Sequence, residues 1–141
     1  MIDVMVGLFV FGLGAAAFYS LMPLFRSGQL ISRYDSTATQ LANRMIEQLQ
    51  TLRPQLITAS SLTDLNLIDA GQVKLPYSFA HVPMDEASKY SPAQLLPKAT
   101  ATMNVTSIDA GSVRVDILMT WESVSGHKNQ LTTGTIVGGY R

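Results

Sequence analysis

The apolar residues of the chain are concentrated in one uninterrupted run near its start. Residues Val4 to Phe25 include no charged side chain, and Asp3 is the one acid that precedes them. About twenty predominantly apolar residues suffice for a helix to cross the hydrocarbon core of a bilayer. The run therefore predicts a membrane-spanning, signal-anchor helix over residues 1–25.

A cleavable secretory signal is the main alternative for this run. Gly14-Ala15-Ala16-Ala17 resembles the small-residue site at which such signals are cut. No basic residue precedes the run, however, and the helical periodicity continues well past that segment, so we favour an anchor. The positive-inside rule finds Arg26 and Arg33 after the run and no Lys or Arg before it. That order would place the residues after the run in the cytoplasm, unless a basic leader precedes the printed sequence.

Four residues that disfavour helices interrupt the run: Gly7, Gly12, Gly14 and Pro23. Glycine costs up to about 1 kcal/mol in a helix interior and proline about 3 kcal/mol. Membrane helices tolerate both where neighbouring groups satisfy the backbone, and small residues allow helices to approach closely. Two interpretations stay open. The segment is either a kinked single span or a helix that packs among copies and bends or partly unwinds at Gly12, Gly14 and Pro23.

An amphipathic helical pattern follows over residues 26–53. Its apolar residues lie three and four positions apart and form one stripe: Tyr34, Ala38, Leu41, Ala42, Met45, Ile46, Leu49 and Leu52. Asp35, Ser36 and Thr37 are candidates to cap or loosen the start of this half, and Pro54 should end it. At 1.5 Å per residue, residues 2–52 would form a rod of about 75 Å, more than twice the thickness of a bilayer. We expect the outer half to stand in water and to bury its stripe against the following domain.

The C-terminal third alternates between apolar and polar residues, which is typical of strands. We expect strands at Thr100–Ile108, Val113–Trp121 and Gln130–Val137, with turns at Asp109-Ala110-Gly111-Ser112 and Ser125-Gly126-His127 between them. One face of the central strand should be apolar: Val113, Val115, Ile117, Met119 and Trp121.

The sequence as a whole predicts an α+β fold. A long N-terminal helix, whose first half spans a membrane, packs on a small antiparallel sheet within a globular domain over residues 54–141. Residues 55–100 are weakly patterned, with short strands expected around Gln72–Leu75 and Tyr77–His81.

Charge and cysteine content exclude several functional classes. The ten basic and ten acidic residues are scattered and balance to zero net charge, so no electrostatic surface for nucleic acid is expected. The chain has no cysteine, which excludes disulfides and thiolate metal sites.

No arrangement of residues predicts catalysis, a cofactor or a metal ion. His81 and His127 lie in expected loops without a second histidine at ligand spacing. Asp64, Asn66 and Asp69 bring oxygens close together but lack the glycine and final glutamate of an EF-hand loop, so turn formation is the favoured interpretation. We favour a packing role for Trp121 over a role in ligand binding, and we expect the protein not to be an enzyme.

Three segments resemble type IV pilin-like proteins. Ile2-Asp3-Val4-Met5-Val6 and Phe11-Gly12-Leu13-Gly14 resemble the mature N-terminus of that family, with Asp3 where the family has glutamate. Ala38–Leu49, followed by Arg53-Pro54, is similar to the second half of the same helix in minor pilins and minor pseudopilins. Val113–Trp121 and Gln130-Leu131-Thr132-Thr133 resemble their closing hairpin.

The printed sequence departs from the family at its start. It lacks the basic leader, the glycine of the peptidase site and the mature phenylalanine that the family carries. A basic leader ahead of Met1 would also reverse the orientation that the charges favour. The cysteines of many major pilins are missing too, which favours a minor member.

The resemblance implies a non-enzymatic structural subunit of a type IV pilus or a type II secretion pseudopilus. Such a subunit crosses the bacterial inner membrane once, with its C-terminal domain exported. The inner-membrane assembly machinery then moves it from the lipid bilayer into a periplasmic or extracellular filament of pilin-like subunits. Asp3 would meet the N-terminal amine of a neighbouring subunit.

The alternative is a bitopic protein whose exported domain binds a partner without polymerising. Asp3 would then lie in the headgroup layer, where an acid complements the dipole at the start of a helix.

Overall fold

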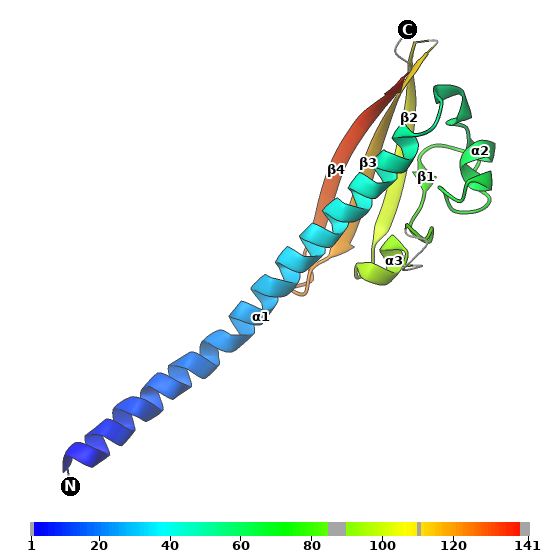
Figure 1. Ribbon diagram of the computed structural model, residues 1–141. Helices are drawn as coiled ribbons and strands as arrows, with labels where there is room; N and C mark the ends of the chain where they lie inside the picture. The colour runs from blue at the N-terminus through cyan, green and yellow to red at the C-terminus, as the bar shows by residue number, and fades with distance from the viewer. Residues whose placement is uncertain (1, 85–89, 110, 139–141) are drawn as a thin grey trace.

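The structure is a computed structural model that describes residues 2–84, 90–109 and 111–138 (Figure 1). A single long helix, α1 (Ile2–Gln50), leads into a four-stranded antiparallel sheet. The second half of α1 lies along the sheet, and its first half projects beyond the rest of the molecule (Figure 1). The predicted α+β class, a long N-terminal helix on a small antiparallel sheet, is confirmed.

Helix α1 runs without interruption through all of its glycines and through Pro23. The expectation of a cap or a loosened start near Asp35 is wrong, because the helix continues through this segment. The Thr39 Oγ1 donates a hydrogen bond to the Asp35 carbonyl oxygen at 2.8 Å, one turn earlier in the same helix. The predicted stop is confirmed, since α1 ends at Gln50 and Pro54 begins the short 3₁₀ helix η1 (Pro54–Leu56).

The sheet is a meander in the order β1-β2-β3-β4. Its strands are β1 (Tyr77–Ser78), β2 (Thr100–Asp109), β3 (Ser112–Glu122) and β4 (Lys128–Gly138). The three C-terminal strands agree with the alternation in the sequence to within two residues at each end. In the β3–β4 ladder Glu122 lies opposite Lys128, so a five-residue turn joins the two strands.

The expected strand at Gln72–Leu75 is wrong. Val73 is exposed, and β2 pairs only with Tyr77 and Ser78 on this side, so the earlier segment has no neighbouring strand. The strand expected over Tyr77–His81 shortens to its first two residues. The Phe79 amide still donates to the Ala101 carbonyl oxygen at 2.9 Å, after which the chain turns away.

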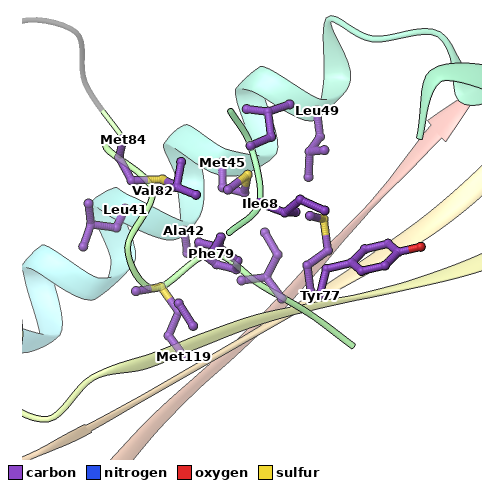
Figure 2. Packing of buried hydrophobic residues seen from close by; sticks show 14 of the residues in the cluster. Leu41, Ala42, Met45, Leu49, Ile68, Tyr77, Phe79, Val82, Met84 and Met119 are labelled. Atoms are coloured by element: carbon purple, nitrogen blue, oxygen red, sulfur yellow. The ribbon is translucent and has the colours of Figure 1, made fainter. Parts of the chain in front are cut away.

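The core lies between α1 and one face of the sheet (Figure 2). The predicted helical stripe supplies Leu41, Ala42, Met45 and Leu49, each at most 4% exposed. The predicted apolar face of β3 supplies Val115, Ile117, Met119 and Trp121. The Gln50 Nε2 also donates to Thr135 Oγ1 at 2.9 Å, which fastens the end of α1 to β4.

The middle of the chain covers the rest of this sheet face and was not predicted in detail. It includes the short helices α2 (Ala59–Asp64) and α3 (Pro92–Leu95). Its buried apolar residues have no regular spacing: Ile57, Leu62, Leu67, Ile68, Tyr77, Phe79, Ala80, Val82, Met84 and Leu96. Several of them meet the helical stripe directly (Figure 2).

Candidate functional site

The first half of α1, over residues 4–25, exposes a long apolar surface. Among the side chains described in this range, Ala15 alone is partly covered and the others are exposed. The exposed bulky residues are Val4, Met5, Val6, Leu8, Phe9, Val10, Phe11, Leu13, Phe18, Tyr19, Leu21, Met22 and Phe25. A contiguous apolar surface of this extent marks contact with lipid or protein.

This half of α1 is long and apolar enough to cross a membrane. The most apolar 18-residue stretch has a mean hydropathy of 2.0, and none of it is buried. A buried core helix of a soluble protein would show the opposite burial. A signal sequence near an N-terminus has the same length and composition, so that alternative stays open.

A shallow apolar groove runs along one side of this exposed half. It is lined by Val10, Phe11, Gly14, Ala15, Phe18, Tyr19 and Met22. Phe11, Gly14 and Phe18 lie three and four positions apart, so one face of the helix carries all three. The missing side chain of Gly14 leaves a hollow between two phenylalanine rings.

The glycines of this half are not required by contacts within the chain. A Cβ added at Gly7, Gly12 or Gly14 would meet no atom within 4 Å. Since glycine costs up to about 1 kcal/mol in a helix interior, its use here calls for a reason outside the chain. Close approach of another helix is the usual one.

The groove lies away from the side of α1 that packs on the sheet. Phe18 and buried Ala38 are twenty residues apart. At about 100° per residue, they lie about 160° apart around the helix axis. A second helix can therefore occupy the groove without meeting the globular domain of the same chain.

The predicted site residues lie at different places on α1. Asp3 belongs to the first turn of the helix, and Gly14 lines the groove. Gly12 lies outside the groove lining, and Pro23 lines a separate hollow beside Val124. Their proposed roles in assembly and helix flexibility stay predictions.

A shared face for Phe11 and Phe18 and the position of Val124 beside α1 were not predicted from the sequence. Phe11, Phe18 and Phe25 recur every seven residues, and this spacing was the signal for a common face. The position of Val124 depends on how the sheet meets α1, which no local pattern shows.

The other candidate residues have structural surroundings. Asp69 accepts hydrogen bonds from Ser78 Oγ at 2.5 Å and from the His81 amide at 3.0 Å, so its carboxylate fastens a turn to β1. Within the described residues, no group of three His, Asp or Glu side chains is placed to hold a metal ion. Trp121 is 4% exposed and packs in the core, as predicted.

Compared with protein-family models, curated proteins and solved structures, the chain matches none.

Proposed function

We propose that this protein is a non-enzymatic subunit of a pilin-like filament, a minor pilin of a type IV pilus or a minor pseudopilin of a type II secretion system. One observation carries the proposal. A single helix is packed on an antiparallel sheet over its second half, and every side chain described over its apolar first half is exposed except that of partly covered Ala15. The resemblance of the sequence around Asp3 and in the C-terminal hairpin supports the same family.

The exposed half of α1 suits both environments that such a subunit occupies. Before assembly, lipid chains cover its apolar side chains, and its length matches the hydrocarbon core. After assembly, the same side chains pack against the helices of neighbouring subunits. Gly14 and the phenylalanines beside it offer a hollow and two large side chains for that packing.

The position of Asp3 supports an assembly contact. A carboxylate within a membrane span costs about 2.5–3.5 kcal/mol on insertion scales. Pairing with a cation of a neighbouring subunit offsets part of that cost inside a bundle of helices. Removing one partner of a buried ion pair is destabilising by about 3–5 kcal/mol, because the other charge is left unpaired.

The second candidate function is a bitopic protein whose exported domain binds a partner. It is favoured by the core of the globular domain, whose residues all lie at or beyond Tyr34 and include none from the first half of α1. The two functions differ in whether the exposed helical halves of separate copies touch.

Cysteine crosslinking between copies tests the proposal. Because the chain has no cysteine of its own, single cysteines introduced between residues 5 and 20 report helix–helix contacts without background. In membranes of cells that assemble the filament, we expect oxidation to give a ladder of multimers. Asp3→Ala should abolish the ladder while the chain stays in the membrane fraction, whereas Asp35→Ala, an exposed acid on the same helix, should leave it unchanged.

Asp3→Glu serves as the conservative control and should restore the ladder, since it keeps the charge. A normal ladder from Asp3→Ala would contradict the assembly role of Asp3. Monomer alone at every tested position would favour the bitopic alternative.

A further inference from the structure

The turn between β3 and β4 lies against α1 at the place where the exposed helical half begins. Val124 in this turn lines a hollow together with Tyr19, Met22, Pro23, Ser27 and Leu30 of α1. In Figure 1 the turn, drawn in orange, lies at the end of the sheet nearest the projecting part of α1. Val124 is an apolar residue in this turn, and 54% of it is exposed.

The helix fixes the depth of this turn if α1 spans a bilayer. The 22 residues of the uncharged run from Val4 to Phe25 cover about 33 Å of helix, close to the thickness of the hydrocarbon core. Residues 26–30 then lie at the level of the headgroups. Val124 lines one hollow with Ser27 and Leu30 of this stretch, so the turn lies in the headgroup layer as well.

Hydrogen bonds within the β3–β4 turn hold it in one conformation. The Ser123 amide donates to the His127 carbonyl oxygen at 2.7 Å, and the Gly126 amide donates to the Ser123 carbonyl oxygen at 2.9 Å. The flanking strands pair along their whole length. Glu122 at the end of β3 is fixed in turn by Lys98, whose Nζ lies 2.6 Å from Glu122 Oε2. The turn therefore keeps its conformation and its place at the end of the sheet unless these bonds are broken.

The charges at this end of the described structure suit an anionic surface. Lys128 and Arg33 are exposed. Glu122 is engaged by Lys98, so its negative charge does not offset Lys128. His127 is exposed beside Lys128. Asp35 is the acid nearest to Arg33 along α1.

We propose that the β3–β4 turn is a second membrane contact of this protein, whose partner is the headgroup layer of a bilayer containing anionic phospholipid. Val124 inserts among the headgroups beside Ser27 and Leu30, and Lys128 and Arg33 face the lipid phosphates. A basic side chain at such a surface gains from the negative potential of the lipids. Two contact points, the span and the turn, fix how the globular domain is rotated and tilted over the membrane.

This inference rests on the membrane span of the proposed function, and the test separates the two. The full chain is prepared with one cysteine, at Val124, Ile136 or Ala16, and each is labelled with an environment-sensitive fluorophore. Ile136 is the matched control, since it is an exposed apolar residue near the far end of β4. The labelled chains are reconstituted into phosphatidylcholine vesicles with and without phosphatidylglycerol, and Trp121 fluorescence checks that each variant is folded.

We expect a headgroup-level lipid quencher to reduce emission at position 124 several-fold more than at position 136, and more strongly when phosphatidylglycerol is present. Lys128→Gln should remove most of the dependence on phosphatidylglycerol. Position 16 should respond to a quencher deep in the acyl chains.

Four outcomes would overturn the proposal. Aqueous iodide reaching positions 124 and 136 equally would place the turn in water, while a deep position 16 would leave the span intact. Protection of position 124 from both quenchers would mean that a second copy covers the turn. Equal quenching in both lipid mixtures would overturn the assignment of anionic lipid. A position 16 open to iodide would instead remove the span itself, and with it both proposals.

Discussion

At the residue scale, Gly134 shows how closely β4 approaches the outer side of β3. A Cβ added at Gly134 would lie 2.7 Å from Asp116 Oδ1 and 3.0 Å from the Val115 carbonyl oxygen. The Asp116 carboxylate is itself fixed, because Arg114 Nε and Nη2 each lie 2.9 Å from its Oδ1. An alanine here must displace either this ion pair or the backbone of β3.

We therefore predict that Gly134→Ala lowers the free energy of unfolding by about 1–3 kcal/mol, the usual cost of overpacking. Denaturant unfolding followed by the fluorescence of Trp121, the single tryptophan, measures it. Gly28→Ala on α1 is the control, since a Cβ there meets nothing within 4 Å. Adding Asp116→Ala to Gly134→Ala should recover part of the loss, and a fully additive double variant would contradict this explanation.

At the scale of elements, the two halves of α1 share one backbone but present different surfaces. The second half buries its stripe on the sheet, whereas the first half has no covered face except partly covered Ala15. Because none of the side chains described over residues 4–25 belongs to the core, substitutions there, away from the hollow beside Val124, should change association between copies and leave the fold unchanged.

Gly14→Leu tests this separation. We predict that it weakens association of the full chain in detergent micelles or membranes by about tenfold or more, since a side chain fills the groove between Phe11 and Phe18. Ala16→Leu is the matched control, because it adds similar bulk on the other side of the helix. Crosslinking yield measures association, and Trp121 fluorescence should be unchanged in both variants. Equal yields from the two variants would exclude the groove as the contact.

The elements that the sequence predicted are those with a regular period. The stripe from Ala38 to Leu49 and the alternation over Val113–Trp121 both repeat long enough to identify their buried faces. Short helices α2 and α3 each contain too few residues for a period to show. Burial of Ile57 or Phe79 follows from where the chain passes over the sheet, which only the tertiary structure determines.

The same reasoning explains what could be predicted of the candidate site. The exposed apolar run and Asp3 were evident because composition alone reveals them. The hollow formed by Val124 and α1 was not, because it joins residues about a hundred positions apart in the sequence. Asp69 was predicted as a turn residue, and its bonds to Ser78 and His81 agree with that interpretation.

At the scale of the whole molecule, the core and the exposed apolar surface occupy different parts of α1. The helix of 49 residues is about 73 Å long at 1.5 Å per residue. None of the side chains described between residues 4 and 37 is buried, and Ala38 is the first residue of the core. Under the proposed function, the exposed half would therefore pass from lipid to protein without rearrangement of the core.

Truncation tests this division directly. We predict that the chain beginning at Gln29 is soluble without detergent and unfolds at a melting temperature within a few degrees of the full chain, with the same Trp121 emission. A chain beginning at Asn43 is the matched control, because it also removes Ala38, Leu41 and Ala42 from the core. Losing one buried Leu side chain alone costs about 2–5 kcal/mol, so this shorter chain should be largely unfolded at ambient temperature. If the chain from Gln29 unfolds or aggregates as readily as the shorter one, the exposed half of α1 supports the domain, and the two parts are not independent.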